Sequence, residues 1–221
     1  LVHTLAANSP TQIYAGTSSF DALQRLSGFG NAWQPIVSGG GGANGEIRAM
    51  LSRVENGAQA VYVAGEFTQV AGVRAHNIAR WDRTSGWSAL GSGRPFPVVA
   101  LAEYVDGPGG DVVTLSRDAN RNVVVATWNG TGWALYPNPL IGTPAALAAF
   151  QGQLYLGGAF VDNQGNAIQS LHRFNGTSWS PVGFTSPVEA LAPIDVGGTD
   201  FLHVGANGIY RSTDGVSFPL V

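Results

Sequence analysis

An internal repeat constrains the fold of this 221-residue chain more than any other feature of its sequence. Short apolar runs such as Val2-His3-Thr4-Leu5 and Val188-Glu189-Ala190-Leu191 recur along the chain and indicate buried strands. Their last positions are separated by 45, 51, 46 and 44 residues and are occupied by Leu5, Met50, Leu101, Leu147 and Leu191. A period of this length is typical of an array in which one supersecondary unit is repeated.

Each repeat carries the pattern of four short strands. The second run, for example Val61-Tyr62-Val63-Ala64-Gly65, is rich in β-branched and aromatic residues and ends at glycine, as a strand followed by a break does. A third run such as Ile78-Ala79-Arg80-Trp81 leads through a turn to an aromatic residue that opens the fourth strand. These aromatic residues are Trp33, Trp87, Trp133, Trp179 and Phe218.

The pattern predicts an all-β fold, a five-bladed β-propeller with four antiparallel strands per blade. A five-blade arc of a larger propeller is the alternative. We expect one domain over 1–221, because no linker or charge run interrupts it. The predicted blades are about 2–46, 47–97, 98–144, 145–187 and 188–221.

The repeats resemble kelch-type repeats, and more closely the LYVGGDFT, IARWDG and W-x-x-LG propeller repeats of bacterial secreted proteins and fungal cortical polarity markers. The match is best from Val61 to Gly91, which includes Glu66-Phe67-Thr68 and Trp81-Asp82. The third repeat departs from it, because it lacks the Gly-Gly step and the arginine of the third strand. The resemblance spans the chain and implies a propeller, but kelch-like rings serve enzymes, lectins and adaptor proteins alike.

Composition restricts the partners and the chemistry of this segment. Charged residues make up 11% of the chain, and the net charge is −3 with 14 acidic residues against 11 basic ones, all arginine. No basic stripe is present to neutralise phosphates, so nucleic-acid binding is not expected. No run approaches the ~20 apolar residues of a membrane span. Cysteine is absent, which removes disulfides and thiolate metal sites.

The resemblance to secreted proteins implies an extracellular or cell-surface location. No signal segment is present, the first residue is Leu1 and the single methionine is Met50. We therefore expect a processed piece, which leaves open an association with other domains of a larger precursor.

The predicted binding site lies on one rim of the propeller. Loops between strands two and three share that rim with the loops joining successive blades, so 66–77, 159–169, 38–46 and 91–97 are expected to gather there. Long loops on a rigid scaffold commonly carry function. The candidate ligand-binding residues are Glu66, Arg74, His76, Asn77, Asp162, Asn163 and Asn166.

Residues at fixed repeat positions are expected to be structural. The aromatic column should pack between blades, and the arginine column of Arg25, Arg80, Arg173 and Arg211 should pair with nearby backbone or carboxylates. The histidines lack metal-ligand spacing, so no metal site is expected. The segment from Asp162 to Asn166 has the composition of a calcium loop but no terminal bidentate acid. A plain turn is therefore favoured, no cofactor is predicted, and calcium is the alternative.

The sequence favours a non-catalytic ligand-binding module of a secreted or cell-surface protein, which recognises carbohydrate or protein through its rim loops. The absence of a nucleophile elbow, a P-loop or a dinucleotide fingerprint supports this prediction. One alternative is a secreted hydrolase or lyase that uses Glu66, Asp162 or His76. Another is a structural ectodomain segment of a larger surface protein.

Overall fold

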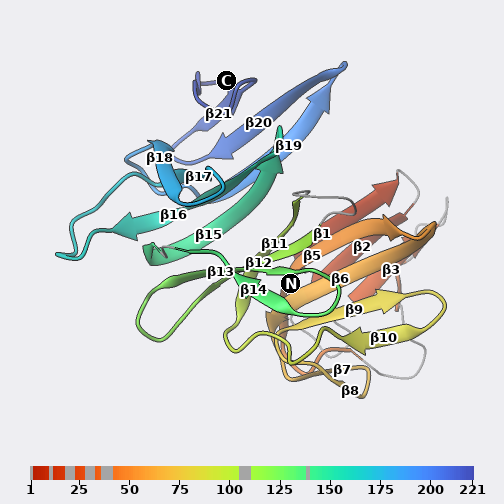
Figure 1. Cartoon of the computed structure of the whole chain (residues 1–221). Coiled ribbons are helices and arrows are strands. Elements are labelled where there is room, and N and C mark those ends of the chain that lie inside the picture. Colours follow the sequence, from red (N-terminus) through yellow and green to blue (C-terminus); the bar gives the residue numbers. More distant parts are fainter. Residues whose placement is uncertain are drawn as a thin grey trace. The chain divides into compact units, whose positions relative to one another are not determined.

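The computed structural model describes the backbone of four strands before residue 36, and describes residues 42–104, 111–137 and 140–221 in full. The chain divides into two compact units (Figure 1). One comprises Leu1–Ala100 with Gly130–Gly132, and the other comprises Leu101–Asn129 with Trp133–Val221. Strands, turns and bends make up the regular structure of the described residues. None of these residues belongs to a helix that could cross a membrane.

The first two repeats form four-stranded antiparallel sheets in the first unit. The sheet of the first repeat has the order β1-β2-β3-β4 and that of the second β10-β9-β6-β5. Their strands are β1 (Val2–Ser9), β2 (Gln12–Thr17), β3 (Leu23–Ser27), β4 (Trp33–Pro35), β5 (Glu46–Glu55), β6 (Ala58–Glu66), β9 (Ile78–Asp82) and β10 (Gly86–Ala89). Between β6 and β9, a small hairpin is made by β7 (Gln69–Val70) and β8 (Val73–Arg74).

The remaining repeats form three further sheets. The third and fourth have the orders β11-β12-β13-β14 and β15-β16-β17-β18, and the fifth has the order β19-β20-β21. Their strands are β11 (Val98–Tyr104), β12 (Asp111–Arg117), β13 (Val123–Trp128), β14 (Trp133–Leu135), β15 (Ile141–Phe150), β16 (Gln153–Val161), β17 (Leu171–Phe174), β18 (Trp179–Gly183), β19 (Ala190–Val196), β20 (Thr199–Gly205) and β21 (Ile209–Ser212).

The prediction of four strands per blade is right for the first four repeats and wrong for the fifth. There the segment after β21 makes one isolated bridge, between Tyr210 and Leu220, in place of a fourth strand. Pro219 has no N–H to donate to a ladder, and Phe218 packs on Phe184 with 5.5 Å between ring centroids. The described structure therefore has four complete four-stranded blades where five were predicted.

The second strand of a repeat forms its core. Consecutive residues are buried along the middle of β6, β12 and β16, at 60–65, 112–116 and 154–158. Neighbouring strand residues point to opposite faces, so both faces of these strands are covered. Continuous burial explains why the segments read as unbroken apolar or small runs and not as an alternating pattern.

A cross-strand pair between strands two and three recurs in four of the five repeats. Tyr14 pairs with Arg25, Tyr62 with Arg80, Tyr155 with Arg173, and His203 with Arg211. The third repeat replaces this pair by Val113 and Thr127. The arginine column is thus one half of a repeated aromatic–arginine pair.

Arg80 has the structural role predicted for the arginine column. Its Nε donates to Glu55 Oε2 at 2.9 Å and its Nη1 donates to Asp82 Oδ2 at 2.6 Å. Tyr62 Oη donates to the other oxygen of Glu55 at 2.5 Å. Elsewhere, the guanidinium of Arg211 lies 4.9 Å from the ring centroid of Phe201. The side chain of Arg25 lies outside the described residues.

The aromatic column packs, but Trp133 and Trp179 do so chiefly within their own repeats, where packing between blades was predicted. Trp128 and Trp133 are opposed across β13 and β14, with ring centroids 5.2 Å apart, and Phe174 and Trp179 repeat this geometry on β17 and β18. Tyr136 of the third repeat lies 4.8 Å from Phe174, which links two successive repeats. The side chain of Trp33 lies outside the described residues.

We expect Gly157→Ala to destabilise the protein by about 1–3 kcal/mol. A Cβ at Gly157 would lie 2.5 Å from Cγ1 of Val188, which is fully buried, so packed side chains would have to move. The matched control is Gly205→Ala at the same repeat position, where the nearest atom is the Cβ of Ala190 at 3.3 Å. Urea unfolding measures both changes, and equal effects would contradict this account of the packing.

Candidate functional site

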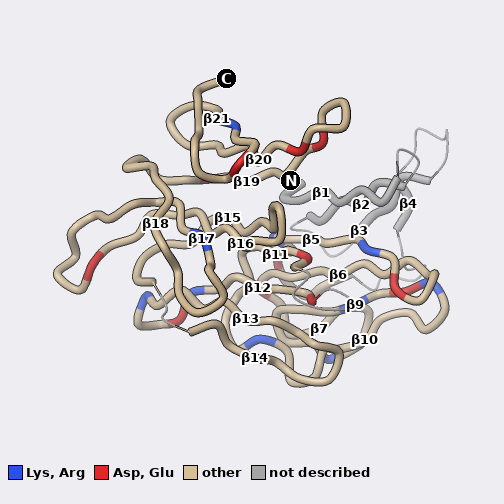
Figure 2. The backbone as a smooth tube through the Cα atoms, turned by 45° about the horizontal axis from the view of Figure 1, so that its top comes forward, with Lys and Arg blue, Asp and Glu red and all other residues tan. Residues whose placement is uncertain are grey.

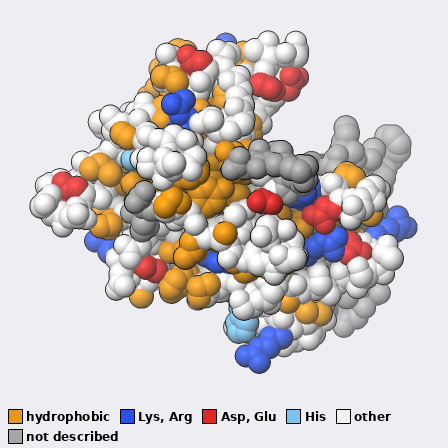
Figure 3. Space-filling model, viewed as in Figure 1, with side chains coloured by type: hydrophobic (Ala, Val, Ile, Leu, Met, Phe, Trp, Pro, Cys, Tyr) orange, Lys and Arg blue, Asp and Glu red, His pale blue; other side chains and the backbone are white. Residues whose placement is uncertain are grey.

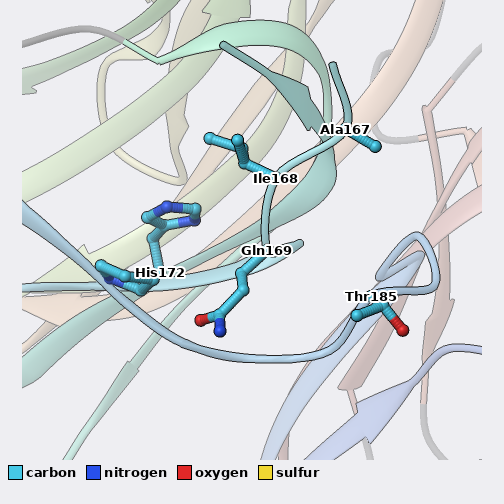
Figure 4. Close-up of a pocket in the computed structure, with 6 residues that line it drawn as sticks. Ala167, Ile168, Gln169, His172 and Thr185 are labelled. Carbon is cyan, nitrogen blue, oxygen red and sulfur yellow. The ribbon is translucent and has the colours of Figure 1, made fainter.

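A cavity of about 600 Å³ lies in the fourth repeat (Figure 4). Its wall includes consecutive residues of the loop between β16 and β17, one residue of β17, one of β18 and one of the segment after β18. The lining residues are Ala167, Ile168, Gln169, His172, Pro181 and Thr185. The volume falls in the range of known ligand sites.

The loop reaches the cavity because a turn folds it back on its own strand. Asp162 Oδ1 accepts hydrogen bonds from the backbone N–H groups of Gln164 and Asn166, each at 2.9 Å. Asp162 Oδ2 accepts from Asn166 Nδ2 at 2.9 Å. The N–H of Ile168 then donates to the carbonyl of Phe160 at 3.0 Å, which fixes the lining residues against β16.

The same turn occurs in the third repeat, where Asp118 accepts from the backbone and the side chain of Asn122 at 2.8 Å. The fourth residue of each turn has positive φ, 68° at Arg121 and 86° at Gly165. The side-chain hydrogen bond from the asparagine holds the pKa of both aspartates below the usual range. The segment from Asp162 to Asn166 is therefore a turn whose carboxylate binds its own backbone, and its residues do not line the cavity.

His172 is a buried member of the lining. Its side chain comes from β17, is 3% exposed and packs edge-to-face on Phe160 with 5.5 Å between centroids. Burial lowers its pKa to about 4, so the imidazole is neutral at pH 7. Among the described residues, Nδ1 has no hydrogen-bond partner.

The place of His172 in the cavity was not predicted from the sequence, in which this histidine was weighed only as a possible metal ligand. The repeat did contain a signal. Residues paired with the middle of strand two are Ala79 in the second repeat and Ala126 in the third, and His172 holds the corresponding place opposite Leu156. The first and fifth repeats carry Gln24 and Tyr210 at this position, so the fourth repeat is distinguished by having a histidine there.

The candidate residues of the first unit serve the structure of their loops. Glu66 Oε2 accepts a hydrogen bond from Arg48 Nη2 at 2.7 Å. Asn77 has a φ of 61°, its Nδ2 donates to the carbonyl of Arg94 at 2.9 Å, and its Oδ1 accepts from the N–H of Phe67 at 3.3 Å. Both residues therefore hold neighbouring segments together.

The other two candidates in this unit are Arg74, which is exposed, and His76, which is half-buried. Arg74 Nε donates a hydrogen bond to His76 Nε2 at 3.3 Å. The predicted gathering of 66–77 with its neighbours is confirmed within this unit. Asn44 Oδ1 accepts from two N–H groups of the loop at 2.9 Å, and the N–H of Arg94 donates to the carbonyl of His76 at 2.8 Å. Residues 38–41 lie outside the described residues, and 159–169 belongs to the other unit.

Charged residues are scattered along the chain (Figure 2), and acidic and basic side chains are interspersed on the face seen in Figure 3. Over 42–104, 111–137 and 140–221, no group of three or more His, Cys, Asp or Glu side chains could hold a metal ion.

Comparisons with known proteins give information on the fold alone. Neither a family model nor a curated protein matches the sequence. The Malassezia sympodialis allergen Mala s 1 aligns over 100% of this chain and 79% of its own, with 11% identity and a TM-score of 0.64. The Neurospora crassa Pan2 WD40 domain aligns over 96% of this chain and 61% of its own, with 12% identity and a TM-score of 0.58. The fold is of the β-propeller type.

The WD40 repeats of RRP9 align over 79% of this chain and 50% of their own, with 15% identity and a TM-score of 0.50. The chain therefore spans about half to three fifths of these two WD40 chains. Since identity is so low, their functions are not transferred. Each four-stranded sheet described above is a propeller blade, and the cavity belongs to blade four.

We expect millimolar calcium to leave the melting temperature of the protein unchanged. The Asp162 oxygens already accept three hydrogen bonds within the turn, and a Ca²⁺ ion needs six to eight oxygen ligands. Differential scanning calorimetry with calcium and with a chelator measures this. A calcium-dependent rise that disappears in Asp162→Asn would instead establish a calcium loop.

We expect the protein to lose stability as the pH falls from about 6.5 to about 4. In this pH range His172 takes up a proton in the unfolded chain but stays neutral in the folded state. The free energy of unfolding therefore falls by up to about 3 kcal/mol. In His172→Ala, which restores the residue of the second and third repeats, this contribution should vanish. Urea unfolding across this pH range measures the difference, and identical pH slopes in the two proteins would contradict the assignment.

Proposed function

We propose that this chain is a non-catalytic ligand-binding propeller module that recognises carbohydrate or protein through the cavity of blade four. The supporting observation is the lining, in which apolar groups combine with a few uncharged polar groups: the amide of Gln169, the neutral imidazole of His172 and the hydroxyl of Thr185. Such a combination is typical of ligand sites, where a few polar groups fix the orientation of the ligand.

The cavity offers no acid–base pair for the alternative of a hydrolase or lyase. General acid–base hydrolysis of glycosides needs two carboxyl groups across the scissile bond, and no acidic residue lines this cavity. Of the predicted rim acids, Glu66 pairs with Arg48 and Asp162 holds its own turn. These roles favour binding over catalysis.

We further propose that the module belongs to a secreted or cell-surface protein and that its repeats are kelch-like. The support is the resemblance of the segment from Val61 to Gly91 to propeller repeats of secreted proteins. Fractionation of the native organism with an antibody against this chain would test the location, and a purely cytosolic signal would remove this part of the proposal.

A glycan array and an immobilised peptide library, both probed with the purified chain, test the binding function. For any ligand found, Gln169→Glu should weaken binding by at least about tenfold, because it places a charge at the mouth of a neutral cavity. Asn163→Asp is the matched control, since it makes the same amide-to-acid change at an exposed loop residue outside the lining. Silence on both arrays, or equal effects of the two variants, would remove the basis of the proposal.

A further inference from the structure

We propose that the blade-four cavity receives an uncharged apolar side chain of a protein segment, rather than a sugar ring or a charged group. The inference rests on the proposed binding function and names its ligand class. It is argued from the residues that line the cavity and from their charge states.

A charged ligand group would find no counter-charge in the cavity. All six lining residues are uncharged at pH 7, because His172 is buried and neutral. Burial of a charge without a partner is strongly unfavourable. The lining therefore selects against acidic and basic side chains, and also against phosphate or carboxylate groups.

A sugar ring that entered the cavity would lose more hydrogen bonds with water than it could form with the lining residues. Sugars carry hydroxyl groups around most of the ring, and each one buried without a partner is costly. Only three lining side chains, Gln169, His172 and Thr185, carry polar atoms, and none of the six is a Trp, Tyr or Phe on which a sugar could stack. A hydrocarbon side chain loses no hydrogen bonds on entering the same space.

The distribution of polarity fits a side chain attached to a peptide backbone. His172 is buried and is held edge-to-face by Phe160, whereas Gln169 and Thr185 are exposed and can form hydrogen bonds at the surface. An apolar side chain can lie against Ile168 and the imidazole while its flanking amide groups reach Gln169 and Thr185. The contact gains from hydrophobic burial and leaves the backbone hydrogen-bonded.

The experiment uses ¹⁵N-histidine-labelled protein at pH 7. The chain has only four histidines, so the imidazole signal of His172 can be followed with His76 and His203 as references. The probes are N-acetyl-leucinamide, the similarly sized N-acetyl-aspartate amide with its carboxylate, and methyl glucoside. We expect a saturable shift of His172 with the leucine probe alone.

Two variants locate the binding. Ile168→Ala removes three carbons from the lining and should weaken binding of the leucine probe by about tenfold. Leu135→Ala, which truncates an exposed leucine outside the lining, should leave it unchanged. Equal effects of the two variants would overturn the assignment to this cavity.

The outcomes separate this inference from the proposed function. A saturable response to methyl glucoside that is weakened by Ile168→Ala would overturn the inference but retain a binding site in the cavity. An equal response to the charged probe would overturn the neutral-ligand argument. If His172 responds to none of the probes, the inference is wrong, and the proposed function then depends on the array experiment alone.

Discussion

The structure depends on burial of the second strand of each blade. In β6, β12 and β16, five or more consecutive residues are withdrawn from water on both faces. Such a strand contributes hydrophobic stabilisation from the apolar side chains on both of its faces and satisfies its backbone through ladders on both edges. The close approach of Gly157 to Val188 shows how little space remains around it. The first, third and fourth strands supply the surroundings that make this burial possible.

In blade two, charged and polar groups beside the second strand are paired within the blade. The repeated aromatic–arginine pair places a guanidinium beside the second strand, and in blade two Arg80 is neutralised by Glu55 and Asp82. Removal of one partner would leave a partly buried charge unpaired, which is more costly than removal of both. Arg80, Glu55 and Asp82 are therefore already engaged in contacts within the fold, and a ligand would have to displace those contacts to bind them. In blade three, Val113 stands in place of the aromatic residue and Thr127 in place of the arginine, so both members of the pair differ together.

Differences between the blades set the cavity of blade four apart from the other blades. An aspartate-centred turn in blades three and four folds the loop back, but only blade four combines that loop with a histidine where blades two and three have alanine. Because His172 is buried without a charged partner, it stays neutral and makes the cavity uncharged. The proposed preference for a neutral apolar group follows from the neutral imidazole of His172 together with Ile168 and Pro181.

The sequence by itself determined the all-β class, the first three strand runs of each repeat and the structural roles of Arg80, Trp133 and Trp179, because these depend on local periodicity and on residue types at fixed repeat positions. It also indicated that loops 66–77 and 91–97 meet, which Arg94 and His76 bear out. Only the tertiary structure decided that the last repeat stops at three strands, that Asp162 and Asn77 support their loops, and that His172 lines a cavity. These depend on where hydrogen-bond partners lie in space, and spacing along a single sequence does not specify that.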